Sequence, residues 1–358
     1  MSDTIRFTLD GQPASAAPGM TIWEVANGQG LVIPHLCHKP APGYRPDGNC
    51  RACMVEIEGE RTLAASCIRE PQEGMVVTTN SQRASSAQKM VVEMLLADQP
   101  AREEARDKSS HLWDMADLHA VQDSRLPALE PERVPLLDDS HLAMRVNLDA
   151  CIQCGLCVRA CREVQVNDVI GMAGRGHDSY PTFDFADPMG ESTCVACGEC
   201  VQACPTGALM PATVLDEDQT GDSQDYDREV DSICPFCGVG CQISLKVKND
   251  KVKFVEGING PANEGRLCVK GRFGFDFIHS PDRVKTPLIK ENGSFREASW
   301  DEALDLVARK LGDIKAEHGS DSIGMLTSAR ITNEENYIAQ KFARAVLGTN
   351  NVDHCARL

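Results

Sequence analysis

A cysteine run that occurs twice is the feature that most constrains this chain. The two copies read CIQCGLCVRAC and CVACGECVQACP, and they supply Cys151, Cys154, Cys157 and Cys161, then Cys194, Cys197, Cys200 and Cys204. This doubled CxxCxxCxxxC spacing is the pattern of a domain that holds two [4Fe–4S] clusters. A zinc site is the alternative, disfavoured because zinc sites rarely show the doubled spacing. Residues 146–212 are therefore expected to fold as a ferredoxin-type unit around two clusters.

In this pattern the fourth cysteine of each run binds the cluster of the other run. We therefore expect one cluster to be held by Cys151, Cys154, Cys157 and Cys204. The second would be held by Cys194, Cys197, Cys200 and Cys161. This exchange would tie the two runs into a single unit.

Two further sets of four cysteines flank this unit. Cys37, Cys50, Cys53 and Cys67 suit a [2Fe–2S] cluster, and Gly48 permits close backbone approach before Cys50. Cys234, Cys237, Cys241 and Cys268 offer four thiolates to a third [4Fe–4S] cluster. A zinc site with four thiolates is the alternative for both sets. It is disfavoured for the first set by the surrounding β-rich pattern, and for the second by the clusters upstream.

Composition agrees with a metal-binding role for the cysteines. The 358 residues include 17 cysteines, and the N-terminus shows neither an apolar signal segment nor a twin arginine. A cytoplasmic chain of this kind more often uses cysteine for metal than for disulfides. No apolar run reaches membrane-spanning length. The net charge of −17 disfavours a nucleic-acid partner and favours solubility.

Residues 1–80 are expected to form a β-grasp domain. An Asp10-Gly11 hairpin turn, a Thr21–Glu24 capping box and a second hairpin near Gly59 indicate two hairpins and one helix. Residues 81–145 follow as a connecting region, with a helix predicted over 82–98. Its apolar face is predicted at Met90, Val91, Met94 and Leu95.

The second half of the chain falls into three segments that differ in amino-acid composition. Residues 213–232 are acidic and are predicted to be a solvated linker. Residues 233–285 form another small cysteine-bearing unit. Residues 286–358 read as helix, strand and helix, which is the start of an α/β domain. The expected fold class is thus α+β and multidomain.

With these motifs in place, the chain resembles the large (alpha) subunit of cytosolic molybdenum- or tungsten-dependent formate dehydrogenases. The resemblance rests on the order of the cluster motifs, on CPFCGVGC with LCVKG, and on SARITNEENYIAQKFARAVLGTNNVDHCARL. It implies a bis-molybdopterin guanine dinucleotide cofactor with Mo or W, formate as substrate, and a flavin-bearing diaphorase partner that reduces NAD+. It also implies that Lys270 lies between the third [4Fe–4S] cluster and the pterin, and that Arg330 and Asn333 approach the cofactor. Residues 233–285 would be the small [4Fe–4S] domain of molybdopterin oxidoreductases.

The chain departs from this family in one region. Many relatives carry a His-x3-Cys-x2-Cys-x5-Cys site for an extra [4Fe–4S] cluster between the first two units. Here the region contains no cysteine, and Gln99 stands near the place of the histidine. His111 and His119 remain, but two histidines without thiolates make a poor cluster site. We predict that this cluster is absent.

The last residues raise a separate expectation. In the family, the residue that follows the match to NNVDHCARL is the metal ligand, either cysteine or selenocysteine. We expect that ligand directly after Leu358, at a UGA codon misread as stop. The alternatives are an arbitrary boundary, a frameshift and a nonsense mutation. Cys355 would then be a neighbour of the active site, and the chain as given would hold no catalytic residue and be inactive alone.

Two other functions remain open from the sequence. The chain could be an electron-transfer subunit with four clusters and no pterin. It could also belong to another molybdopterin oxidoreductase or to a hydrogenase-linked complex.

Overall fold

The computed structural model describes residues 4–128 and 136–355 of the chain. The chain divides into two compact units, which are described separately. The first comprises Met1–Arg228 and Lys246–Lys248, and the second comprises Glu229–Leu245 and Asn249–Leu358. Among the described residues, no helix is both long and apolar enough to cross a membrane.

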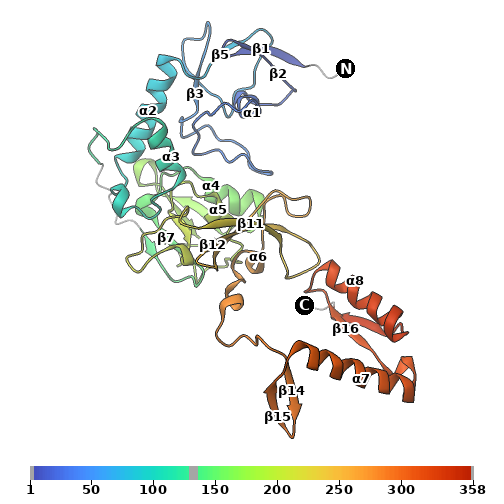
Figure 1. Cartoon of the computed structure of the whole chain (residues 1–358). Helices are drawn as coiled ribbons and strands as arrows, with labels where there is room; N and C mark the ends of the chain where they lie inside the picture. Colours follow the sequence, from blue (N-terminus) through green and yellow to red (C-terminus); the bar gives the residue numbers. More distant parts are fainter. Residues whose placement is uncertain (1–3, 129–135, 356–358) are drawn as a thin grey trace. The chain divides into compact units, whose positions relative to one another are not determined.

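The first unit opens with a five-stranded sheet in the order β2-β1-β5-β3-β4 (Figure 1). Its strands are β1 Ile5–Leu9, β2 Gln12–Ala16, β3 Met54–Ile57, β4 Ala64–Ala65 and β5 Val76–Thr78. Strands β1 and β2 pair antiparallel across the predicted Asp10-Gly11 turn, where both residues have positive φ. Strand β5 pairs parallel to β1. Helix α1, Ile22–Gly28, begins at the predicted capping box of Thr21 and Glu24.

Helices α2 (Gln82–Leu96) and α3 (His111–Leu118) follow this sheet. The predicted apolar face of α2 is half right: Val91 and Leu95 pack against the core, whereas Met90 and Met94 are exposed. Val92 and Leu96 are buried as well. The buried face also carries Gln88, whose Nε2 donates to the carbonyls of Met54 at 2.8 Å and Thr79 at 3.3 Å. A buried polar side chain with backbone partners does not register in a hydrophobicity pattern.

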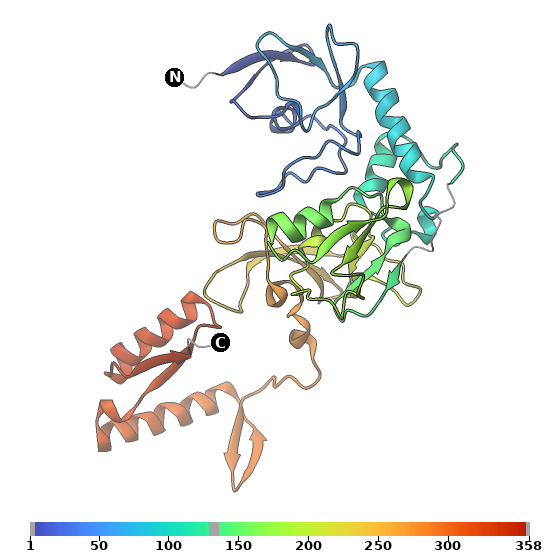
Figure 2. The same cartoon turned by 180° about the vertical axis from the view of Figure 1, so that it is seen from behind.

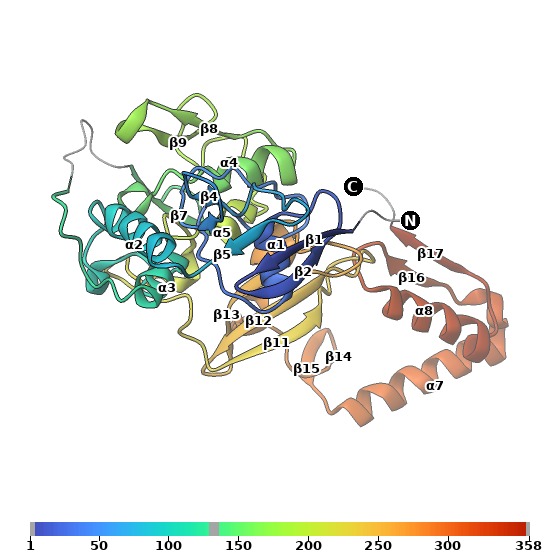
Figure 3. The ribbon, with the colours of Figure 1, turned by 90° about the horizontal axis from the view of Figure 1, so that it is seen from above.

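The ferredoxin-type region of the same unit is built from short elements. They are β6 Leu137–Asp138, β7 Met144–Asn147, α4 Leu156–Arg159, β8 Ile170–Ala173, β9 Tyr180–Phe183, α5 Glu199–Ala203 and β10 Leu209–Pro211. One sheet has the order β10-β7-β6, and β8 with β9 forms a hairpin that is clearest in Figure 3. Helix α4 continues into a π-helical turn over Ala160–Val164.

Most of a three-stranded sheet, in the order β11-β12-β13, belongs to the second unit, and helix α6 packs near β13. The elements are β11 Arg228–Ile233, β12 Gln242–Lys248, β13 Lys251–Gly257 and α6 Val269–Phe273. Strand β11 begins inside the stretch predicted as an acidic linker. Its residues are all exposed, which explains why the sequence has no apolar alternation that would predict the strand.

The last part of this unit contains the predicted helix, strand and second helix (Figure 2). They are α7 Trp300–His318, β16 Met325–Ser328 and α8 Asn333–Phe342, preceded by the hairpin of β14 Leu288–Glu291 and β15 Ser294–Glu297. Strand β17, Val352–Cys355, was not predicted and pairs parallel to β16. A π-helical turn covers Ala343–Leu347. Within the described residues, the 3-10 segments are Arg102–Glu104, Leu148–Ala150, Gly176–Asp178, Ala212–Val214, Asp276–His279 and Ser320–Ser322.

Candidate iron–sulfur sites

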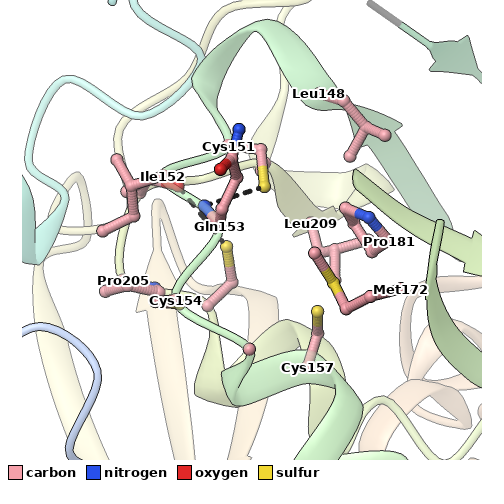
Figure 4. A pocket seen from close by; sticks show the side chains of 14 residues that line it. Leu148, Cys151, Ile152, Gln153, Cys154, Cys157, Met172, Pro181, Pro205 and Leu209 are labelled. Atoms are coloured by element: carbon pink, nitrogen blue, oxygen red, sulfur yellow. Dashed lines mark hydrogen bonds between the residues drawn. The ribbon is translucent and has the colours of Figure 1, made fainter. Parts of the chain in front are cut away.

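Two cavities in the ferredoxin-type region are each lined by four cysteines. The first is lined by Cys151, Cys154, Cys157 and Cys204, with apolar walls from Leu148, Met172, Pro181 and Leu209 (Figure 4). The second is lined by Cys161, Cys194, Cys197 and Cys200. These are the two sets that the crossed spacing predicts, with the fourth cysteine of each run lying in the cavity of the other. That the thiolates bind iron stays a prediction.

The two runs share an unusual local backbone. Gln153 and Ala196 occupy the same place in their runs, and both have positive φ. Each is followed by a cysteine and then by a left-handed glycine, Gly155 or Gly198, that precedes a short helix. This path turns backbone N–H groups toward sulfur, since Gln153 N donates to Cys151 Sγ and Ala196 N to Cys194 Sγ, both at 3.4 Å.

The chemistry of these cavities fits thiolate-bound clusters. Burial, with a smaller contribution from nearby Cys204, raises the pKa of the Cys151 thiol to about 11, against the lowering effect of the Gln153 N–H. Burial likewise raises the pKa of Cys154 and Cys157. Free thiols there are protonated at neutral pH, so cluster insertion must release their protons. Bound iron would supply the positive charge that the apolar walls lack. In residues 4–128 and 136–355, no His, Cys, Asp or Glu group forms a ready site for a single metal ion.

The [2Fe–2S] set lies at the edge of the β-grasp core. Cys37, Cys53 and Cys67 are buried, and Cys53 and Cys67 belong to that core. The Sγ atom of Cys50 accepts from the backbone N–H of Cys37 at 3.4 Å. Gly48 has φ +66°, and a Cβ there would lie 2.6 Å from Ile68 Cδ1. The loop before Cys50 therefore needs glycine, as the sequence indicated.

The third set lies in the second unit, between β11 and α6. Burial raises the pKa of Cys234, with Cys268 and Cys237 near enough to raise it further. The backbone N–H of Cys234 donates to the carbonyl of Cys241 at 2.8 Å. These four cysteines, which span 35 positions in the sequence, thus lie close together in the structure.

The three residues predicted to approach the pterin have different surroundings. Lys270 is exposed on α6, two positions after Cys268. Arg330 is exposed in the turn before α8, where its backbone N–H donates to Ser328. Asn333 opens α8, and its Nδ2 donates to the carbonyl of Gly238 at 2.8 Å, in the loop between Cys237 and Cys241. Asn333 therefore contacts the loop that carries Cys237 and Cys241. Residues 356–358, and with them the approach to the expected metal ligand, lie outside the described residues.

The region of the missing extra cluster motif is packed with apolar side chains. Leu112, Trp113 and Ala116 of α3 join Val92 and other buried residues in one core. The ring of His111 lies 4.8 Å from that of His35, between centroids. Burial lowers the pKa of His119. Gln99 ends the turn after α2, with its N–H donated to Leu96.

Contacts between the [2Fe–2S] loop and the ferredoxin-type region were missed by sequence reasoning. Arg159 is buried, and its Nη2 donates to the carbonyl of Cys37 at 2.6 Å and to that of Cys154 at 3.4 Å. Its Nη1 forms an ion pair with Asp47. The only sequence signal was an arginine placed between two cysteine ligands, in CVRAC.

Comparison with known families agrees with the arrangement of the four cysteine sets. A 2Fe-2S iron-sulfur cluster binding domain matches residues 2–82, and a 4Fe-4S dicluster domain matches 150–208. The molybdopterin oxidoreductase Fe4S4 domain matches 227–280, and the molybdopterin oxidoreductase family matches 283–358. The α+β multidomain fold expected from the sequence is confirmed by these matches.

Two curated relatives are each similar to nearly the whole of this chain. The "Putative formate dehydrogenase YrhE" of Bacillus subtilis (strain 168) is 34% identical over 99% of this chain and 40% of its own length. A subunit of the NADH-quinone oxidoreductase of Rhizobium meliloti (strain 1021) is 36% identical, with the same two coverages. The chain thus spans about 40% of the length of these curated relatives.

Among solved structures, a chain of an NAD+-reducing [NiFe]-hydrogenase in the H2-reduced state is similar. Its sequence is 31% identical, with a TM-score of 0.52, and the match covers 58% of this chain and 87% of that one. The order of the matched domains is that of the N-terminal region of a molybdopterin oxidoreductase with its iron–sulfur domains, to which this chain is distantly similar.

Proposed function

We propose that the complete protein oxidises formate to CO2, with release of one proton and two electrons, and that this chain conducts the electrons. The observation that carries the proposal is the 34% identity to the "Putative formate dehydrogenase YrhE", which extends over 99% of this chain. The four cysteine sets support the electron-transfer part. Each would hold one cluster, and a row of clusters moves electrons singly between two separate reaction sites.

The residues proposed as iron ligands are the sixteen cysteines of the four sets. They are Cys37, Cys50, Cys53 and Cys67 for [2Fe–2S], and Cys151, Cys154, Cys157, Cys204, Cys161, Cys194, Cys197, Cys200, Cys234, Cys237, Cys241 and Cys268 for three [4Fe–4S] clusters. Within the ferredoxin-type region, the support is the sorting of eight cysteines into two separate cavities.

The proposed catalytic cofactor is a bis-molybdopterin guanine dinucleotide with Mo or W. When bound, this group accepts the two electrons of formate. Lys270 is proposed to lie between it and the third cluster, with Arg330 and Asn333 on the approach to it. The bond from Asn333 to Gly238 supports a place beside the third cysteine set, since it joins α8 to the loop of that set.

The proposed partner is a flavin-bearing subunit that reduces NAD+, in the cytoplasm. Its support is the likeness to a chain from an NAD+-reducing hydrogenase. In such an arrangement the [2Fe–2S] domain would pass electrons to the partner.

The test is formate-dependent reduction of the complete, anaerobically purified protein. We expect bound Mo or W, and we expect formate to generate the electron paramagnetic resonance (EPR) signals of reduced clusters. A preparation with full iron and Mo or W that dithionite reduces and formate does not would overturn the choice of substrate.

A second function is favoured by a specific observation. The 36% identity to the NADH-quinone oxidoreductase relative is as extensive as the formate dehydrogenase match. On that function the chain would belong to an electron-transfer protein that binds no pterin. Fluorescence analysis of released pterin separates the two, because such a protein would carry four clusters and no pterin.

A further inference from the structure

We propose that Arg159 is a positioning residue that links the [2Fe–2S] site directly to the first [4Fe–4S] site and holds the reduction potentials of both clusters up. This inference rests on the electron-transfer role of the clusters and is independent of the substrate. It concerns the cluster pair of Cys37 and Cys154, which lie 117 positions apart in the sequence.

The guanidinium of Arg159 lies between the two cysteine sets. Its Nη2 donates to the carbonyl oxygen of Cys37 at 2.6 Å and to that of Cys154 at 3.4 Å. Cys37 belongs to the [2Fe–2S] set, and Cys154 belongs to the first [4Fe–4S] set. Only 3% of the Arg159 side chain is exposed, so water does not replace these bonds. A single planar group therefore bridges a ligand residue of one cluster to a ligand residue of the next.

The loop between Cys37 and Cys50 makes further contacts with the ferredoxin-type region. Asn49 Nδ2 donates to the Cys154 carbonyl at 3.4 Å, and Tyr44 Oη donates to Glu199 at 2.7 Å. Lys39 Nζ donates to the carbonyl of Gln202 at 3.0 Å. These contacts fasten the loop between Cys37 and Cys50 onto the ferredoxin-type region. The two sites are thus held in contact, with no cysteine between positions 67 and 151 to support a cluster on an alternative route.

The charge of Arg159 affects the reduction potentials of both clusters. Each reduction adds a negative charge to a cluster that thiolates already make anionic. A buried cation beside the ligand backbone favours the reduced form and raises the potential. Asp47 is paired with Arg159 and has the opposite effect. Because the site is shielded from water, both effects are stronger than they would be at the surface.

The test compares Arg159→Gln, Asp47→Asn and a control in the complete protein. Arg162→Gln is the control, because Arg162 lies three positions further along the same helical segment and pairs with Asp168 at a half-exposed position. Chemical redox titration with dithionite and mediators, followed by EPR, gives the midpoint potential of each cluster without formate.

We expect Arg159→Gln to lower the potentials of the [2Fe–2S] and first [4Fe–4S] clusters, and Asp47→Asn to raise them. Arg162→Gln should leave both unchanged. Electron transfer from the ferredoxin-type region to the [2Fe–2S] cluster, timed by rapid freezing, should slow at least ~10-fold in Arg159→Gln. A merely structural role would not give shifts of opposite sign. Unshifted potentials in both variants, or shifts of the same sign, would overturn the proposal.

If Arg159→Gln fails to assemble its clusters, Asp47→Asn and Arg159→Lys carry the test. Arg159→Lys keeps the charge and loses the two-carbonyl bridge. It should therefore keep the potentials near those of the parent protein and still slow the transfer. A normal transfer rate in Arg159→Lys, together with unshifted potentials in Asp47→Asn, would refute the bridge.

Discussion

At the scale of single residues, glycines with positive φ fix the loops beside the cysteines. Gly207 follows Cys204 by three positions and has φ +80°. A Cβ at this position would lie 2.6 Å from Asp107 Cβ and 3.1 Å from Asp107 N. Asp107 is itself buried and accepts from the backbone N–H groups of Ser109 and Ser223. The site therefore has little room to adjust.

We expect Gly207→Ala to lower the free energy of unfolding by about 2–4 kcal/mol, from backbone strain together with overpacking. Gly176→Ala is the matched control, since Gly176 has φ +59° and nothing within 4 Å of the added Cβ. It should cost only the strain, about 1 kcal/mol. Urea unfolding under anaerobic conditions, followed by cluster absorbance, measures both. Equal losses in the two variants would show that the contact with Asp107 is unimportant.

Residue-level prediction from the sequence is strongest where spacing carries the information. The two cavities hold the cysteine sets that the repeated run predicts, and Gly48 lies where a close approach requires it. Arg159 could not be found in this way. Its contact with Cys37 joins positions 122 apart, and only the packing of two domains creates it.

At the scale of elements, helix α2 shows that a buried face need not be an apolar one. Gln88 is 4% exposed, and its amide bonds α2 to the carbonyls of Met54 and Thr79. Glu93 on the same helix is bonded to Arg125. Met90 and Met94, which hydrophobicity alone would bury, face outward. Hydrogen-bond partners, which a single sequence does not reveal, act on the orientation of this helix together with the apolar packing of Val92 and Leu96.

A hydrophobic substitution at Gln88 tests this orientation. We expect Gln88→Leu to lower the free energy of unfolding by about 1–3 kcal/mol, because the carbonyls of Met54 and Thr79 lose a buried donor. Gln82→Leu is the matched control, since Gln82 lies in the first turn of α2 and its amide bonds only to the exposed Ser86. Thermal unfolding of both variants gives the comparison. A stabilised Gln88→Leu would mean that burial of apolar area outweighs the lost bonds.

Elements with local signals were predicted well, and elements set by distant pairing were not. The Asp10-Gly11 hairpin and the capping box of α1 are confirmed. The parallel pairing of β5 with β1 joins segments about 70 positions apart, and β17 pairs with β16 across an intervening helix. Neither pairing leaves a pattern within its own strand.

At the scale of the whole molecule, the parts of the chain differ in what holds them together. The β-grasp sheet encloses a core of buried side chains that includes Phe7, Leu9, Ile22 and Val77. The ferredoxin-type region instead winds around two cysteine-lined cavities. Its helices α4 and α5 have four and five residues. Helices this short are not stable by themselves in water, so the bonds to the clusters must supply much of their stability.

Removal of iron should therefore affect these parts unequally. After anaerobic treatment with a chelator and an oxidant, we expect backbone amides of Cys151–Arg159 and Cys194–Ala203 to lose protection from hydrogen exchange. Amides of β1 and β5 should keep theirs, because the sheet retains its apolar core. The loaded protein under the same buffer is the control, and mass spectrometry of peptides resolves the segments. Equal loss across the sheet and the ferredoxin-type region would mean that the clusters stabilise the β-grasp as well. Unchanged protection in both would mean that the chain around the cavities is held by its own packing, and that the clusters are bound by a preformed fold.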